Sequence, residues 1–176
     1  LFLIFFFFIT ISYLSFFGYE TDRFNKIINS EIKKTNKDIA IDFKKISILL
    51  DIKNMDLLVK FINPKLNLYN TSIPLKLLKT QINLDFLTKK KIVIRKIILS
   101  TEYLDFNKTK PLFSKIGLRS DNLKNIIRGE FEINDLKLEF DKNFELKKDL
   151  KIQGSVKNAH FKLSEKHIIK NLRSNF

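Results

Sequence analysis

The sequence predicts a mainly β protein whose strands follow two helical segments at the N-terminus. Three patterns in the 176 residues lead to this prediction. Residues 1–19 are almost entirely apolar, residues 20–37 carry apolar side chains at helical spacing, and a two-residue alternation dominates from Asp38 onward. We therefore expect an N-terminal transmembrane helix, a short amphipathic helix, and an antiparallel β domain over residues 38–176.

The first segment, LFLIFFFFITISYLSFFGY, contains seven phenylalanines and no charged residue. As one helix, its 19 residues would extend about 28 Å, close to the hydrocarbon thickness of a bilayer. We expect a single-pass signal anchor over 1–19, with Tyr13 and Tyr19 at the membrane interface. The alternative is a cleaved signal peptide, which has a shorter apolar stretch and small residues before the cut. The chain opens on Leu1, so we expect a missing start, and flanking charges cannot give the orientation.

Residues 20–37, ETDRFNKIINSEIKKTNK, are predicted to form a juxtamembrane amphipathic helix. Thr21 or Asp22 can cap its N-terminus. Such a helix either lies along a membrane interface or closes one end of the domain that follows. Four apolar residues at three- and four-residue intervals form its stripe: Phe24, Ile27, Ile28 and Ile32.

From Asp38 the alternation of apolar and polar residues is typical of strands with one buried face. Lys44 and Lys45 shift its phase, which predicts a β-bulge. Turn signals at 70–74 and Gly154 separate later strands, whereas 108–127 is irregular and suits short helices. Because almost no helix lies between them, the strands are expected to pair antiparallel. The predicted strands are 39–52, 56–62, 65–69, 80–86, 91–100, 103–106, 129–140, 144–153 and 155–163, with a further helix or strand from 167.

One face of the predicted sheet is rich in Ile, Leu and Phe, and the other in Lys, Asp, Asn and Glu. The apolar face must be covered, because exposing so much apolar surface to water is unfavourable. Closure into a barrel, a second sheet, the short helices or an apolar ligand would each cover it.

The formal net charge is +14, yet only five of the 33 basic residues are Arg. Bidentate recognition of bases favours Arg over Lys, so we expect no nucleic-acid partner. Two explanations remain for the scattered lysines: a solvated face, or attraction to anionic lipid headgroups.

Nothing in the sequence predicts an enzyme. The chain has no cysteine, no phosphate-binding glycine loop, and none of the common nucleophile or metalloprotease motifs. The segment 141–152 resembles a calcium loop but lacks its central glycine and its final glutamate. His160 and His167 are expected at the surface or at the rim of the sheet rather than as catalytic bases. We therefore predict no catalytic residue, no metal site and no cofactor.

Several segments resemble the start of the AsmA-like family of Gram-negative envelope proteins, which includes TamB- and YhdP-type members. IAIDFKKISILLDI is similar to a first long strand region, and VKFINPKLNLYNTSIPL to a turn followed by a short strand. LKTQINLDFLTKKKIVIRKIILSTEYLDF resembles a strand–break–strand unit, and GSVKNAHFKL the start of a later repeat. The resemblance covers most of the chain, but it consists of alternation and turns rather than invariant chemical groups.

This resemblance implies an elongated, curved antiparallel sheet that forms a groove for acyl chains. It also implies a single-pass protein of the bacterial inner membrane whose β domain lies in the periplasm. The implied function is phospholipid transport between membranes, or outer-membrane maintenance, with membrane lipids as partners. Envelope protein partners stay unknown, and the β domain is expected to continue beyond Phe176. The candidate groove residues are Ile39, Ile41, Phe43, Ile48, Leu50, Ile82, Leu84, Phe86, Ile92, Ile94, Ile97, Leu99, Phe131 and Ile133.

Two alternatives do not need a lipid cargo. In the first, the same apolar residues form a closed core, and the chain is a membrane-tethered scaffold or interaction domain. In the second, the leader is removed and the chain is a secreted basic protein.

Overall fold

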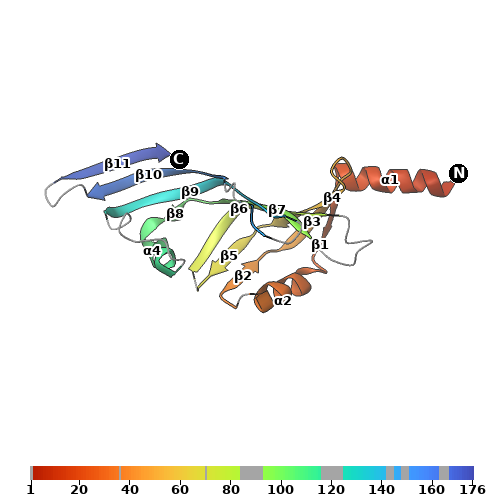
Figure 1. Cartoon of the computed structure of the whole chain (residues 1–176), viewed down its shortest axis with the longest axis horizontal. Coiled ribbons are helices and arrows are strands. Elements are labelled where there is room, and N and C mark those ends of the chain that lie inside the picture. The colour runs from red at the N-terminus through yellow and green to blue at the C-terminus, as the bar shows by residue number, and fades with distance from the viewer. Residues whose placement is uncertain are drawn as a thin grey trace.

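The computed structural model describes residues 2–35, 37–69, 71–83, 93–115, 125–141, 145–147, 151–162 and 167–176. It confirms a mainly β protein built on one large antiparallel sheet (Figure 1). The helices are α1 (Phe2–Phe16), α2 (Asn25–Thr35) and α4 (Phe106–Lys115). The strands are β1 (Tyr19–Thr21), β2 (Ile39–Asp42), β3 (Lys45–Asp51), β4 (Asp56–Ile62), β5 (Lys65–Leu68), β6 (Thr71–Asn83), β7 (Ile94–Thr101), β8 (Leu104–Asp105), β9 (Ile126–Glu139), β10 (Lys151–Lys162) and β11 (Ile168–Asn175).

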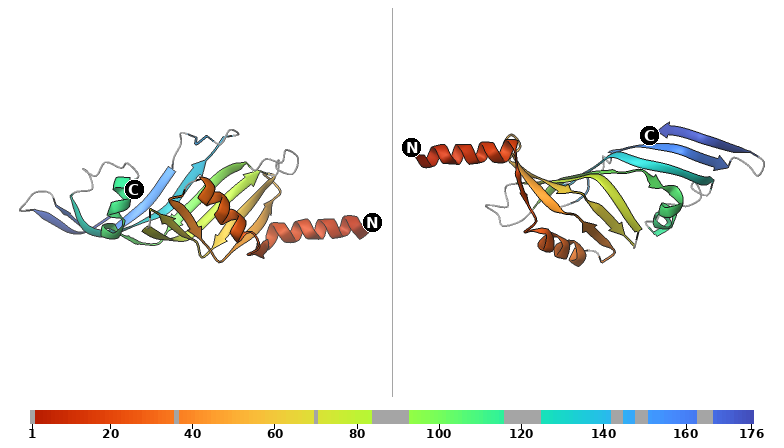
Figure 2. Two further views of the ribbon diagram at one scale, coloured as in Figure 1. Left: turned by 90° about the horizontal axis from the view of Figure 1, so that it is seen from below. Right: turned by 180° about the vertical axis from the view of Figure 1, so that it is seen from behind.

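The sheet follows the order β1-β3-β4-β6-β7-β9-β10-β11, and every pairing is antiparallel. Strands β2 and β5 form a branch that joins the first half of β6, and β8 pairs with β9. Figure 2 shows that the sheet twists and curves along its length, with α2 and the β2–β5 branch on one side. Such twisting is expected of a sheet with many strands.

Helix α1 ends earlier than the sequence predicts. The N–H groups of Phe17 and Gly18 both donate to the Tyr13 carbonyl oxygen, at 2.9 and 3.2 Å, and Gly18 has a φ of 74°. A glycine in this left-handed conformation is a common helix ending. The 15 residues of α1 extend about 22 Å, whereas the hydrocarbon core is about 30 Å thick. Among the described residues, none of the helices has the length and apolar character needed to cross a membrane.

The transmembrane helix predicted over residues 1–19 is therefore not supported. The chain turns at Gly18, and Tyr19–Thr21 pairs with β3 as the first strand of the sheet. Tyr19 lies opposite Ile48 in this pairing. A segment that appears continuous in hydropathy is thus divided between a helix and a strand by one glycine.

The short amphipathic helix is confirmed as α2, although it begins at Asn25 rather than at residue 20. Helix α2 contacts β2, and Ile28 packs against the buried core. The side-chain amide of Asn25 donates to the Lys44 carbonyl oxygen at 2.9 Å, which ties the start of the helix to the entrance of β3. In the structure, α2 therefore covers part of the domain that follows it.

Three local predictions about strands are wrong. Lys44 and Lys45 do not form a bulge, because the chain leaves the β2–β5 branch after Asp42 and enters the main sheet at Lys45. The expected turn at 70–74 is largely strand, since Pro74 pairs with Lys65 in the branch. Strand β10 also continues through Gly154, where a break was expected.

The buried core lies on the inner face, which faces α2, the β2–β5 branch and α4. Ile46 and Leu78 are 2% and 5% exposed, and Leu112 of α4 joins them in the same cluster. Register shifts in β6 between Leu75 and Leu77, and in the β9–β10 pair beside Ile133, let apolar residues stay on this face along long strands. The residues of the core cluster are Ile46, Val59, Phe61, Ile73, Leu75, Leu78, Leu104 and Leu112.

Candidate functional site

Directly opposed residues connect the inner face from strand to strand. Ile48 lies opposite Val59, Ile82 lies opposite Leu57 and Ile94, and Leu99 lies opposite Leu78 and Leu136. Opposed residues in an antiparallel pair project from the same face. The alternation read from the sequence therefore becomes one apolar surface that runs across the main sheet.

Seven of the eleven predicted groove residues that the structure describes pack against the buried core. Phe43, for example, meets Phe61 edge to face with their ring centres 4.9 Å apart. Ile39, Leu50 and Ile94 are half-buried elsewhere on the strands. The residues packed against the core are Ile41, Phe43, Ile48, Ile82, Ile97, Leu99 and Phe131. Leu84, Phe86 and Ile92 lie outside the described residues.

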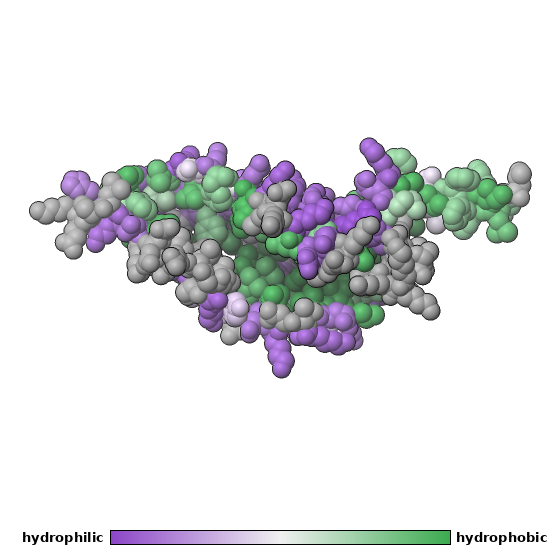
Figure 3. Space-filling model, viewed as in Figure 1, coloured by the Kyte–Doolittle hydropathy of each residue, from purple (hydrophilic) through white to green (hydrophobic). Residues whose placement is uncertain are grey.

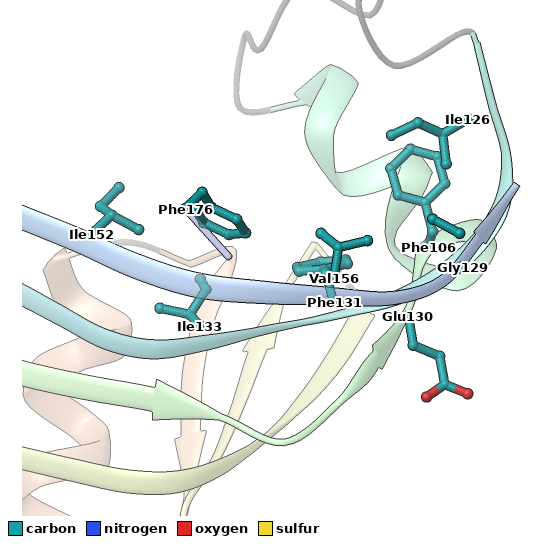
Figure 4. A pocket seen from close by; sticks show the side chains of 10 residues that line it. Phe106, Ile126, Gly129, Glu130, Phe131, Ile133, Ile152, Val156 and Phe176 are labelled. Atoms are coloured by element: carbon teal, nitrogen blue, oxygen red, sulfur yellow. The ribbon is translucent and has the colours of Figure 1, made fainter. Parts of the chain in front are cut away.

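An open apolar cavity of about 390 Å³ lies over β9 and β10, beyond the main core (Figure 4). Among the predicted groove residues, Phe131 and Ile133 line it. The remaining side chains of the cavity come from α4, the two strands and the C-terminal residue. They are Phe106, Ile126, Glu130, Ile152, Val156, Ala159 and Phe176, together with Gly129.

The lining of this cavity is apolar despite the presence of one acid. In Figure 4 the Glu130 side chain extends away from the apolar side chains around it. Its carboxylate instead pairs with Lys157, whose Nζ lies 3.0 Å away. The Glu130 carboxylate therefore does not point into the cavity, and the described side chains that face the cavity are apolar.

Phe176 forms one side of the cavity because β10 carries a glycine beneath it. Gly154 and Phe176 exchange backbone hydrogen bonds of 2.9 and 3.0 Å. A Cβ on Gly154 would lie 2.3 Å from the Phe176 Cζ. The absence of a side chain at Gly154 therefore leaves room for the Phe176 ring to pack against β10.

Sequence reasoning missed most of this cavity. Because Gly154 is a turn signal, the predicted strands 144–153 and 155–163 separate Ile152 from Val156, whereas in the structure both lie on β10 and line the cavity. The alternation of Ile152, Gly154 and Val156 through the glycine is the signal that could have found them.

The opposite face carries a hydrogen-bonded cluster around the buried carboxylate of Glu132. Lys76 Nζ donates to Oε2 at 2.5 Å and Ser155 Oγ donates to Oε1 at 3.0 Å. Tyr103 contacts this cluster, since its hydroxyl lies 3.3 Å from Ser155 and the Lys157 Nζ lies 3.4 Å from its ring centre. The Lys76 hydrogen bond lowers the pKa of Glu132, and the same bond raises the pKa of Lys76.

The predicted membrane-interface tyrosines occupy different elements. Tyr13, on α1, stacks on Phe17 with ring centres 5.4 Å apart, whereas Tyr19 belongs to β1. Both are about half exposed, at 54% and 48%.

The two histidines also differ. His160 is buried beside Arg128, whose Nε lies 3.3 Å from His160 Nδ1, which corrects the expectation that it lies at the surface. His167 is exposed. Over the described residues, acidic residues and histidines form no group of three or more that could hold a metal ion.

The site is therefore an apolar surface that closes into a core at one end of the sheet and opens into a cavity at the other. Comparison of the chain with protein-family models, with curated proteins and with solved structures found no match.

Proposed function

We propose that this protein binds the acyl chains of membrane lipids in the cavity over β9 and β10. The observation that supports this most is an open apolar cavity of about 390 Å³; among its described lining residues the one charged side chain, Glu130, is paired with Lys157. An acyl chain gains free energy from such a lining, whereas an unpaired charge there would be costly. Ligand cavities in proteins commonly have volumes of about 300–1,000 Å³.

We propose further that α1 associates the protein with a membrane by inserting into lipid. Its sequence has no charge, and Phe5, Phe6, Phe7 and Phe8 are 61–64% exposed. A helix that is apolar on all sides is normally surrounded by apolar material, which lipid would supply here.

The broader role that we propose is transport of phospholipid between membranes, or maintenance of the outer membrane, in the bacterial envelope. The support is the resemblance to AsmA-like proteins together with the continuous apolar inner face. On this proposal, the inner face acts as a groove along which acyl chains pass, and the cavity is its open part.

The acyl-chain proposal is tested by native mass spectrometry of the full chain purified with bound lipid. Val156→Trp fills the cavity and is expected to remove most of the co-purifying lipid. Gln153→Trp places the same side chain at an exposed position three residues earlier on β10 and is expected to leave lipid occupancy unchanged. Equal lipid occupancy in both variants and the wild type, or a lipid-free wild type, would contradict the proposal.

Membrane association by α1 is tested separately. Phe6→Asp with Phe7→Asp is expected to move the protein from the membrane fraction to the soluble fraction. Ser30→Asp with Ser72→Asp adds the same charge at exposed positions of the body and is expected to leave the distribution unchanged. If the α1 variant stays in the membrane fraction, α1 is not the membrane contact.

The second candidate is a membrane-tethered scaffold with a closed core and no lipid cargo. The observation that favours it is the close packing of seven predicted groove residues against buried neighbours such as Ile46. A lipid-free, monodisperse protein would support this candidate over the first.

A further inference from the structure

We infer that the outer face of the sheet binds the surface of a bilayer that contains anionic phospholipids. The outer face is the one opposite the buried core. This inference deepens the proposed function, and it rests on membrane association rather than on the acyl-chain cavity.

The observation behind it is a row of lysines that crosses the sheet on this face. Lys60 of β4 lies directly opposite Lys79 of β6, and Lys137 of β9 lies directly opposite Lys151 of β10. Ile98 of β7 lies between the two pairs, opposite both Lys79 and Lys137. At a strand spacing of about 4.8 Å, these four lysines cover roughly 19 Å. We call them the lysine row.

The lysine row lies on the outer face because its neighbours along each strand lie on the inner one. Val59 and Leu78 are buried in the core, and they precede Lys60 and Lys79 in sequence. Successive side chains of a strand point to opposite faces. Figure 3 shows hydrophilic side chains, with apolar ones among them, along the side of the sheet that lies away from α2. Helix α1 extends from the end of the sheet that carries β1 and β3.

The arrangement does not favour folding. Like charges directly opposite each other across a strand pair are destabilising. On the described chain, some lysines of this face have acidic partners: Lys137 of the row pairs with Asp135, and Lys96 beside the row pairs with Glu139 at 2.9 Å, a carboxylate that also attracts Lys151. Within that same part of the structure, no carboxylate forms an ion pair with Lys60, Lys79 or Lys151. An external anion would relieve the repulsion.

A bilayer fits this row better than a polynucleotide does. Lysine is a compact point charge that suits phosphate headgroups without a fixed geometry, whereas base recognition favours Arg. The row contains no Arg, and α1 offers an exposed apolar helix to the same partner. Each basic residue near an anionic leaflet contributes about fivefold to membrane binding.

The test measures binding of the full chain to vesicles of phosphatidylcholine alone and of phosphatidylcholine mixed with phosphatidylglycerol. The wild type is expected to bind the anionic vesicles more tightly, with an advantage that falls as salt rises. The triple variant Lys60→Gln, Lys79→Gln, Lys151→Gln is expected to lose about a hundredfold in binding to anionic vesicles. Equal binding of the wild type to both vesicles would overturn the inference.

A matched control separates the lysine row from net charge. Lys26→Gln, Lys33→Gln, Lys37→Gln removes the same charge from exposed positions on and after α2 and is expected to retain most binding. Equal losses in both triple variants would show that total charge, not this face, attracts the membrane, and would overturn the inference. Tighter, row-dependent binding of a DNA duplex at the same ionic strength would overturn it in favour of a polynucleotide.

A single substitution gives a second, independent readout. Lys79→Glu replaces the repulsive pair with an attractive one, so it is expected to raise the Tm while it lowers binding to anionic vesicles. A lower Tm would contradict the claim that the row opposes folding. Val156→Trp should reduce lipid occupancy yet leave vesicle binding unchanged, so failure of the cavity proposal and failure of this one can be told apart.

Discussion

At the scale of single residues, the stability of the sheet depends on the buried apolar side chains of the core cluster. Leu78 is 5% exposed and lies between Leu75 and Thr80 along the inner side of β6, where it is opposite Leu99 of β7. Protein interiors are close-packed, so a missing side chain leaves a cavity that its neighbours fill only in part.

Leu78→Ala is therefore expected to lower the free energy of unfolding by about 2–5 kcal/mol. Urea denaturation should show a lower midpoint with an unchanged slope. Ile127→Ala removes apolar surface from a position that is 42% exposed, and its effect should stay within about 0.5 kcal/mol. Similar losses in the two variants would mean that Leu78 is not part of a tightly packed core.

Because of Glu132, the stability of the fold should depend on pH in the acidic range. Its pKa is lowered, chiefly by the hydrogen bond from Lys76. Its contribution is therefore complete above its ordinary pKa of about 4.5 and is lost as the pH falls through the lower folded value. Lys76 acts in the opposite range: its pKa is raised, so its contribution is lost only as the pH rises through a value above 10.5.

The measurement is the Tm of the wild type and Glu132→Gln between neutral and acidic pH. The wild type should be more stable at pH 7, and its advantage should shrink below about pH 4.5. Glu145→Gln changes an exposed carboxylate on the surface and should leave the acid dependence of the wild type intact. If the Tm of the wild type exceeds that of Glu132→Gln by the same amount at every pH, the pH dependence does not come from Glu132.

At the scale of elements, Gly18 sets the direction in which α1 leaves the sheet. Its φ of 74° is unfavourable for residues with a Cβ, and a Cβ there would lie 2.9 Å from Leu49 Cγ and 3.0 Å from the Ile48 carbonyl oxygen. The turn therefore needs both the backbone freedom and the small size of glycine.

Gly18→Ala is expected to lower the free energy of unfolding by at least about 1–2 kcal/mol, the cost of the left-handed conformation alone. Gly18→Asn should lower the free energy of unfolding by less than Gly18→Ala, because Asn tolerates the left-handed conformation better. Its Cβ still meets the same neighbours, so some loss is expected. Chemical denaturation measures both. A neutral Gly18→Ala would show that the turn can relax at no cost.

The cavity also arises at the scale of elements, from the pairing of β9 with β10. Strand β10 stays paired with β9 through Gly154, and its register shifts there keep Ile152 and Val156 on the face of Ile133. The close approach of Phe176 to Gly154 then completes one wall. None of these residues indicates a cavity by itself in the sequence, because it is the pairing of β9 with β10 that brings them together.

At the scale of the whole molecule, positive charge is the dominant property. A formal net charge of +14 on 176 residues creates self-repulsion in the compact state. Salt screens such repulsion over about 8–10 Å at physiological ionic strength.

The Tm is therefore expected to rise when sodium chloride is increased from low to moderate concentration. The variant with Gln at positions 60, 79 and 151 should show a smaller rise, because its outer face carries fewer opposed charges. Differential scanning calorimetry measures both increments. A Tm that falls with salt would mean that attractive ion pairs outweigh the repulsion.

The sequence by itself determined the β class, the antiparallel pairing, the short helix α2 and the apolar inner face that contains Ile48, Ile82 and Leu99. These properties follow from local patterns: a period of two, a period of 3.6, and turn residues between them. Strand β4 was predicted with its exact bounds, since turn residues flank a short, mostly apolar run on both sides.

Only the tertiary structure decided where the chain turns and which residues meet. Gly18 ends α1 through a hydrogen bond to Tyr13, and Pro74 enters a strand because β5 pairs with it. Gly154 stays within β10 because it pairs with Ile133 of β9 and exchanges backbone hydrogen bonds with Phe176. The lysine row exists only through the register of five strands. Register and long-range pairing join residues that are distant in sequence, whereas periodicity describes each segment alone.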